Sequence, residues 1–127
     1  MSQFNDTGYK TFVCDEAIPL YARVKLDSDG RVTVAGLADR DIGTATRQTF
    51  AAGEAVAVKL RSAGGTHKMI AIEALSAGAI VYTEANGKVQ DTAAATSYIL
   101  GTALESAAND GDIIEVVYNA HGDTAAQ

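Results

Sequence analysis

The chain has 127 residues, the length of one small domain, and a formal net charge of −6. Proteins that bind nucleic acid through its phosphates have Lys and Arg residues gathered in patches. The ten basic residues here are instead scattered from Lys10 to Lys88. We therefore expect no direct contact with nucleic acid, and for the same reason none with an anionic membrane surface. Leu, Ile, Val and Phe make up only 28 of the 127 residues, so the core is thin and oligomerisation can add burial.

The single cysteine, Cys14, cannot form an intrachain disulfide, which suits folding in a reducing cytoplasm. The first ten residues lack the charged-then-apolar pattern of a secretion signal. No apolar run approaches the ~20 residues that a membrane-spanning helix needs. We expect a soluble chain that is not secreted.

The N-terminal region is relatively aromatic, with Tyr9, Phe12 and Tyr21, and with Phe4 in the arm before them. These rings either cover one edge of the core or lie against a neighbouring subunit or a larger assembly. We take Phe4, Tyr9 and Phe12 as candidate partner-contact residues. The expected parts of the chain are an N-terminal arm over residues 1–12, a β domain over 13–118 and a C-terminal tail over 119–127.

Short alternating or β-branched segments bounded by turn residues predict strands along the chain. Asp29-Gly30 and Asn86-Gly87 predict hairpin turns, because both residues of each pair can adopt a positive φ. Residues 92–108 are alanine-rich and fit a helix by propensity, but the matching earlier segment favours a strand. We therefore predict a strand over 98–104 and allow a short helix nearby. The other predicted strands are 22–26, 31–34, 55–60, 68–72 and 113–118.

An internal repeat relates residues 16–58 to residues 73–116, at an offset of 57 that becomes 58 after one insertion. The order of the turn and strand residues is the same in both halves, and Gly-Thr-Ala recurs at 43–45 and 101–103. Two copies are too few for a solenoid and suit two halves packed about a pseudo-twofold axis. The predicted fold is mostly β, a small β-sandwich or barrel-like domain built from two similar β-modules, with a short helix allowed.

The sequence offers no cluster of reactive groups. His67 follows Gly-Gly-Thr and His121 lies in the polar tail, so we expect both to be exposed loop residues. Cys14 precedes Asp15 and Glu16 and is expected to be packed and inert. The stretch 27–30 lacks the later ligands of a calcium loop, and 37–41 is expected to be a solvated turn. We predict no catalytic residue, no metal site and no cofactor.

One ordered series resembles a known family. It runs Ala-Gly-Ala-Ile-Val-Tyr at 77–82, Ala-Asn-Gly-Lys-Val at 85–89, Ile-Leu-Gly-Thr-Ala-Leu-Glu at 99–105, and Gly-Asp at 111–112 before the last strand. This is similar to the small decoration, or cement, proteins of tailed-phage capsids, and the similarity covers roughly residues 10–118.

The resemblance implies a β-sandwich or barrel-like fold without a cofactor. It also implies a homotrimer on the outer surface of the virion, assembled in the host cytoplasm and bound to the major capsid protein. The family offers no invariant functional residue to carry over to this chain.

Two other function classes stay open at this point. The chain could be a carbohydrate- or receptor-binding β-module on a virion or cell surface, although such sites favour exposed aromatics and the chain has no Trp. An enzyme would need Cys14 or a histidine to meet carboxylates that are distant in sequence. The expected function is therefore non-enzymatic: decoration and stabilisation of a capsid by bridging its subunits.

Overall fold

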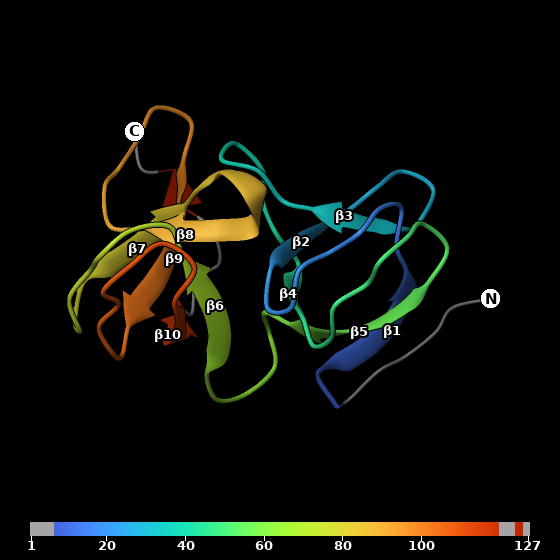
Figure 1. The fold of residues 1–127 in the computed structure, drawn as a ribbon, viewed down its shortest axis with the longest axis horizontal. Helices are drawn as coiled ribbons and strands as arrows, with labels where there is room; N and C mark the ends of the chain where they lie inside the picture. Colours follow the sequence, from blue (N-terminus) through green and yellow to red (C-terminus); the bar gives the residue numbers. More distant parts are fainter. Residues whose placement is uncertain (1–6, 120–123, 126–127) are drawn as a thin grey trace.

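The computed structural model describes residues 7–119 and 124–125, and almost all of its regular structure is β-strand. The strands form two bodies that lie side by side (Figure 1). The N-terminal module comprises β1 (Tyr9–Val13), β2 (Arg23–Leu26), β3 (Val32–Val34), β4 (Gly43–Ala45) and β5 (Ala55–Leu60). The C-terminal module comprises β6 (His67–Ala71), β7 (Ile80–Thr83), the short helix η1 (Ala85–Gly87), β8 (Lys88–Gln90), β9 (Tyr98–Ala103) and β10 (Ile113–Tyr118).

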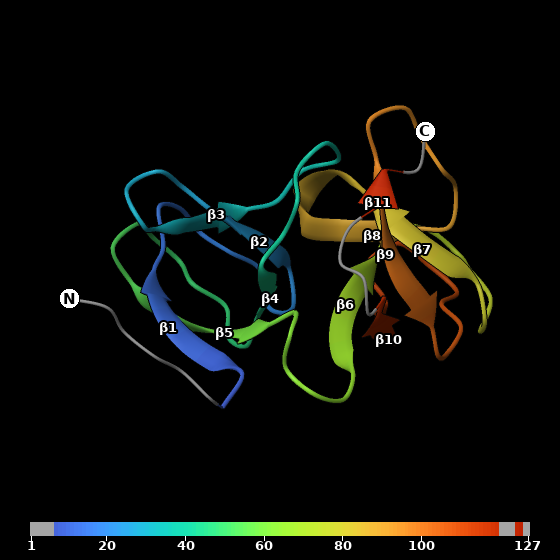
Figure 2. The same cartoon turned by 180° about the vertical axis from the view of Figure 1, so that it is seen from behind.

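Each module is a five-stranded sheet curled toward closure. The N-terminal order is β1-β5-β4-β2-β3, and an isolated parallel bridge between Cys14 and Val32 joins its two edges. The C-terminal order is β10-β6-β8-β7-β9, and pairing of β9 with β10 closes it into a barrel. A last strand, β11 (Thr124–Ala125), pairs with β9 and is visible from behind (Figure 2). The prediction of a mostly β, barrel-like fold with two similar modules and a short helix is confirmed.

The two modules share one pairing register. Val24 pairs with Gly43 as Val81 pairs with Gly101. The other ladders agree in the same way. In the parallel ladder, Cys14 pairs with Val32 in the N-terminal module, and the equivalent residues Ala71 and Val89 pair in the C-terminal module. A residue of the N-terminal module can therefore be assigned an equivalent 57 or 58 positions later in the C-terminal module.

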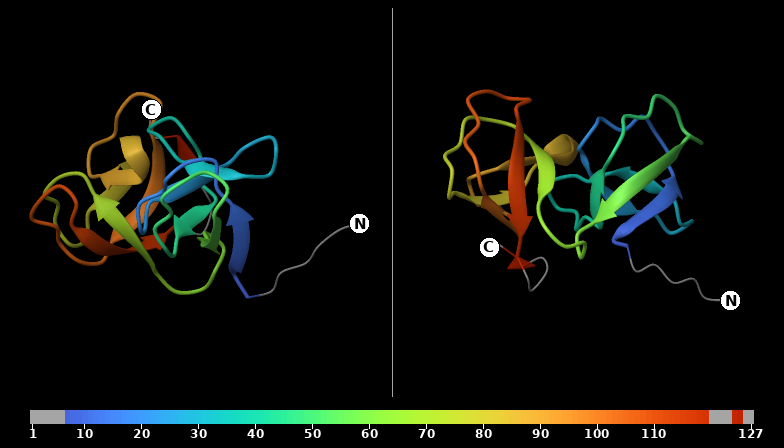
Figure 3. Two further views of the ribbon diagram at one scale, coloured as in Figure 1. Left: turned by 45° about the vertical axis from the view of Figure 1, so that its right-hand side comes forward. Right: turned by 90° about the horizontal axis from the view of Figure 1, so that it is seen from below.

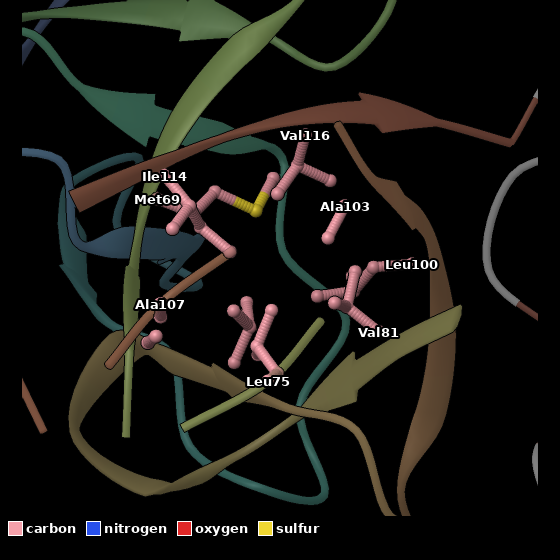
Figure 4. Packing of buried hydrophobic residues seen from close by; sticks show 10 residues of the cluster. Met69, Leu75, Val81, Leu100, Ala103, Ala107, Ile114 and Val116 are labelled. Atoms are coloured by element: carbon pink, nitrogen blue, oxygen red, sulfur yellow. The ribbon is translucent and has the colours of Figure 1, made fainter. Parts of the chain in front are cut away.

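Each module has its own hydrophobic core, formed by residues that alternate inward along the strands. Figure 4 shows the C-terminal cluster, in which Met69 of β6, Val81 of β7, Leu100 of β9, and Ile114 and Val116 of β10 point toward one another. The N-terminal cluster is built the same way from the equivalent strands. Small cores of this kind bury limited apolar area, so the contact between the modules matters for stability.

Two hairpins show different turn chemistry. Asn86 and Gly87 both have positive φ (63° and 72°), and the Lys88 N–H donates to the Ala85 carbonyl, which is the predicted two-residue turn. In the earlier hairpin only Gly30 has positive φ, and its N–H donates to the Asp27 carbonyl. The expectation of positive φ at both residues is thus wrong there: the two hairpins have the same length, but the turn over 27–30 places only its last residue in the left-handed region.

The ambiguous alanine-rich region contains β9, in agreement with the predicted strand over 98–104. At the N-terminus, β1 begins at Tyr9, so residues 9–12 of the segment expected to be an arm belong to the sheet. Residues 1–6 and most of the expected tail lie outside the described residues. Within the described part of the chain, no helix is long and apolar enough to cross a membrane.

Candidate functional site

Arg23 holds the two modules together. It points out of the N-terminal barrel, yet its side chain is fully buried because the C-terminal module covers it. Its Nε donates to the Lys88 carbonyl at 3.1 Å, and its Nη2 donates to the Glu84 carbonyl at 2.6 Å and to the Gly36 carbonyl at 3.3 Å. A guanidinium presents donors in a rigid fork, so one side chain can satisfy several carbonyls of the opposite hairpin.

The opposite surface belongs to the β7–β8 hairpin and to β6. The Gly87 N–H donates to the Ala35 carbonyl at 2.8 Å, and the Thr83 hydroxyl donates to the Leu37 carbonyl at 2.5 Å. A Cβ at Gly87 would lie 2.9 Å from the Cβ of Ala22, so only glycine permits this approach. These contacts join the hairpin of one module to the segment that follows β3 in the other. The views in Figure 3 show the two modules next to each other.

The contact between the modules is not reciprocal. In a twofold arrangement, the equivalents of Arg23 and Gly87 would meet in the same way. Instead Ile80, the equivalent of Arg23, is 51% exposed, and a Cβ at Gly30, the equivalent of Gly87, would meet nothing within 4 Å. The expected pseudo-twofold packing is therefore wrong: the modules are arranged head to tail.

A buried polar cluster lies beside this contact. The Tyr118 hydroxyl donates to Asp41 at 2.7 Å, and Arg61 pairs with the same carboxylate at 3.2 Å. The Arg61 guanidinium also lies 4.5 Å from the centroid of the Tyr118 ring, and the His67 ring meets that ring edge-on at 4.7 Å. Burial raises the pKa of Tyr118 well above its ordinary value, and the Asp41 charge adds to this effect, so Tyr118 remains a neutral donor.

His67 and Asp41 correct two expectations from the sequence. His67 begins β6 and is only 2% exposed, rather than lying in an exposed loop, and Asp41 is buried rather than part of a solvated turn. The His67 Nε2 donates to the Leu60 carbonyl at 2.9 Å, and Nδ1 is buried with no hydrogen-bond partner among the described residues. Burial, with the nearby charges of Lys59 and Arg61, lowers the pKa of His67. His121, the other histidine, lies outside the described residues.

This environment predicts a loss of stability in mild acid. Because the pKa of His67 is lowered in the fold, the unfolded chain binds the proton more readily, and stability falls as the pH drops below the ordinary value of 6.5. The slope is at most about 1.4 kcal/mol per pH unit for one proton. Urea unfolding between pH 7.5 and 5.5, above the carboxylate range, measures it.

His67→Gln is the matched control for this prediction. Its amide can donate to the Leu60 carbonyl but does not titrate in this range, so the slope should become shallower. His121 is present in both proteins and cancels in the comparison. An equal slope in the variant and the natural protein would contradict the assignment to His67.

An open cleft of about 780 Å³ runs between the modules. Thr66 in its wall donates to the Glu115 carboxylate at 2.6 Å, Lys59 donates to the Thr66 carbonyl, and Lys68 lies 5.4 Å from the centroid of the Tyr21 ring. Lys59, Lys68 and Glu115 are thus each engaged with an uncharged partner. The cleft offers both hydrogen-bond donors and hydrogen-bond acceptors, as a binding surface does. Among the described residues, it shows no nucleophile paired with a base.

The predicted contact residues fall in different places. Tyr9 is 47% exposed on β1 and lines the cleft, with the Lys59 ammonium 6.0 Å from the centroid of its ring. Phe12 is half-buried and packs against the N-terminal core, because alternation along β1 turns it to the other face. Phe4 lies outside the described residues. A role for the three in partner contact stays a prediction.

Other groups singled out from the sequence are structural. Cys14 is fully buried, as expected, and its Sγ lies 3.3 Å from the Ala51 carbonyl. The carboxylates of Asp15, Asp27 and Asp29 approach within 4.8 Å of one another at the surface, and hydrogen bonding to Asp27 raises the pKa of Asp15. Such exposed acidic groups are common without an ion, and this one gives no independent sign of a metal site.

The Gly-acid pair before the last strand of each module has a shared structural role. Glu54 accepts the N–H groups of Phe50 and Ala51 at 2.9 and 2.8 Å. Its equivalent, Asp112, accepts those of Ala108 and Asn109 at 2.8 and 3.0 Å. These bonds to the charged form lower the pKa of both carboxylates. The pair therefore fixes a loop and carries no chemistry.

Known proteins resemble this chain in fold and in sequence family. The solved structure of the head fiber gp8.5 N base in bacteriophage phi29 has the same fold, with a TM-score of 0.72 and 16% sequence identity over 91% of this chain and 96% of that one. No curated protein matches the chain significantly in sequence. The model of a family described as phage cement protein matches residues 15–118. The chain therefore belongs to the phage cement protein family.

Proposed function

We propose that the protein decorates the outer surface of a phage capsid and stabilises it by bridging neighbouring major capsid protein subunits, as a homotrimer assembled in the host cytoplasm. The observation that carries the proposal is the match of the cement family over residues 15–118. The fold shared with a phage head fiber base supports a place on the virion.

The physical properties of the chain suit this role. A net charge of −6 disfavours binding to the packaged DNA, so the surface is available for protein contacts. In a homotrimer each capsid-contact surface occurs three times, and the linked contacts act together through effective concentration. Weak individual contacts can then hold adjoining capsid subunits against outward pressure.

The role needs no catalysis, and we propose that the protein is not an enzyme. Among the described residues, the two groups most able to react, Cys14 and His67, are buried and engaged with backbone carbonyls. We also propose no cofactor and no direct contact with membrane or nucleic acid. Shape and burial supply what bridging requires.

Binding to capsids tests the proposal. The purified protein should co-sediment with expanded capsids of its own phage, saturate at a fixed ratio to the major capsid protein, and raise the temperature at which the capsids break open. Bovine serum albumin at equal concentration serves as the non-binding control. If the protein stays in the supernatant at saturating concentrations, the proposal fails.

The same assay tests the contact residues. Tyr9→Ser removes an exposed ring and Phe4→Ser removes the ring nearest the N-terminus, so both should weaken co-sedimentation while the solution mass is unchanged. Phe12 packs against the core and is less suitable, because its replacement also destabilises the fold. Phe50→Ser, at a ring 73% exposed in the loop between β4 and β5, is the control.

A further inference from the structure

The head-to-tail contact inside the chain leaves one unpartnered copy of each contacting surface. We call the outward row across the second, fourth and fifth strands of a module its sheet face: Arg23, Thr44 and Lys59 in the N-terminal module, and Ile80, Thr102 and Val117 in the C-terminal module. We call a second surface of each module its hairpin face; it combines one outward residue of the module's first strand with the end of the hairpin between its second and third strands. In the N-terminal module it comprises Val13, Leu26, Asp27, Gly30 and Arg31. In the C-terminal module it comprises the equivalents Ile70, Thr83, Glu84, Gly87 and Lys88.

Within the chain, the N-terminal sheet face meets the C-terminal hairpin face. Arg23 and Thr44 are 0% and 3% exposed there, and Ile70 belongs to the hydrophobic cluster of the N-terminal module. The contact is closed by the Arg23 and Gly87 hydrogen bonds described above. The N-terminal sheet face and the C-terminal hairpin face thus form a buried interface between two modules of the same fold.

The two remaining faces are open, and each exposes a pair of apolar side chains. On the C-terminal sheet face, Ile80 and Val117 flank Thr102 in cross-strand register and are 51% and 37% exposed. On the N-terminal hairpin face, Leu26 and Val13 are 49% and 40% exposed. Four of the large exposed apolar side chains therefore occupy positions whose equivalents are covered or polar within the chain.

The substitutions between equivalent positions point the same way. Arg23 and Lys59 of the internal sheet face become Ile80 and Val117 on the free sheet face, and Thr83 of the internal hairpin face corresponds to Leu26 on the free one. A solvated surface has no reason to exchange charged residues for branched apolar ones, whereas a surface covered by another apolar surface does. The free faces match each other in chemistry.

We propose that a second copy of the chain occupies these faces: the N-terminal hairpin face of one copy docks on the C-terminal sheet face of the next, in the geometry of the internal contact. The inference rests on the homotrimer of the proposed function and assigns its interface. A contact of this kind is heterologous, and it closes into a ring when the rotation between successive copies allows. Three chains then contain the contact three times within chains and three times between them.

Complementation between variants tests the docking. Leu26→Asp places a charge on the hairpin face and leaves the sheet face intact, whereas Ile80→Asp does the opposite. Each residue is about half exposed, so folding should persist, which circular dichroism checks. Light scattering after size-exclusion chromatography at about 100 µM should give three times the monomer mass for the natural protein and the monomer mass for each variant alone, a loss of affinity of at least about thirtyfold.

An equimolar mixture of the two variants should give a 1:1 dimer, because one intact hairpin face can dock on one intact sheet face and growth stops there. Phe50→Asp should keep the natural mass, since its equivalent Ala108 stays exposed although the internal contact is formed. If Leu26→Asp or Ile80→Asp misfolds, Val13→Asp on the hairpin face and Val117→Asp on the sheet face replace them as the test pair. A monomeric natural protein, a variant that assembles alone, or a mixture that stays monomeric overturns the proposal.

Capsid binding separates this inference from the proposed function. If the variants complement one another but the natural protein ignores capsids, the decoration role fails while the interface stands. If the natural protein binds capsids as a monomer, the interface fails and decoration stands. Loss of capsid affinity in Leu26→Asp, restored by adding Ile80→Asp protein, would link the two.

Discussion

Replacing Gly101 with alanine is expected to destabilise the C-terminal module strongly. Its backbone approaches β10 so closely that an added Cβ would lie 1.9 Å from the Val117 oxygen and 3.0 Å from the Cα of Tyr118. Those atoms are main chain inside a closed ladder and cannot move aside as a flexible side chain can. Overpacking commonly costs 1–3 kcal/mol and more where backbone must shift, so we expect a loss of at least about 3 kcal/mol.

Urea unfolding monitored by circular dichroism measures this loss. Gly43→Ala should behave alike, because its Cβ would lie 2.1 Å from the Lys59 oxygen in the equivalent crossing. Gly64→Ala is the control: nothing lies within 4 Å of its Cβ, and stability should change by less than about 0.5 kcal/mol. Near-natural stability of Gly101→Ala would show that the strands do not cross so closely.

Arg23→Ala should separate the two modules. It removes three hydrogen bonds and leaves the carbonyls of Gly36, Glu84 and Lys88 without this donor in a buried contact. The Gly36 and Lys88 carbonyls still accept from the Asp39 and Glu84 N–H groups, whereas the Glu84 carbonyl loses its Arg23 donor. One buried carbonyl left unsatisfied costs about 1–3 kcal/mol, and the cavity left by a fully buried side chain adds to it, so the summed loss should reach about 3 kcal/mol or more. Amide hydrogen exchange should accelerate in the hairpin around Gly87, whose N–H bonds across the contact.

Arg40→Ala is the matched control for Arg23→Ala. Arg40 is exposed and stacks at 5.2 Å over Tyr98, so its loss should cost less than about 1 kcal/mol. Arg23→Met keeps most of the side-chain volume without the donors and should also destabilise. Equal stability of the Arg23→Ala and Arg40→Ala proteins would mean that the buried guanidinium does not hold the modules together.

The sequence predicted what depends on local chemistry. The strands 55–60 and 113–118 match β5 and β10, and Asn86-Gly87 forms the expected turn. The Gly-Thr-Ala repeat, found as a pattern, has a physical cause: its glycine lets the fourth and fifth strands of each module cross at short distance. Local periodicity and turn residues encode these features, so sequence suffices for them.

Burial imposed by the other module was not predictable from local pattern. Alternation along β2 correctly turns Arg23 out of its barrel, but only the three-dimensional packing of the modules buries it. The expectation for His67 is wrong for the same reason. The two glycines at 64 and 65 that precede it in the sequence indicate a loop, whereas the polar cluster around Tyr118 encloses its side chain. One usable signal was missed, namely the exchange of Arg23 and Lys59 for Ile80 and Val117 between equivalent positions.

The buried thiol of Cys14 makes the molecule convenient for spectroscopy. Because the side chain has no accessible surface and packs inside the N-terminal module, maleimide dyes should react with it slowly while the protein is folded. A single engineered surface cysteine can then carry a fluorophore without first removing the natural one. Donor and acceptor dyes placed on separate copies would report their approach by energy transfer, in free solution and on intact virions alike.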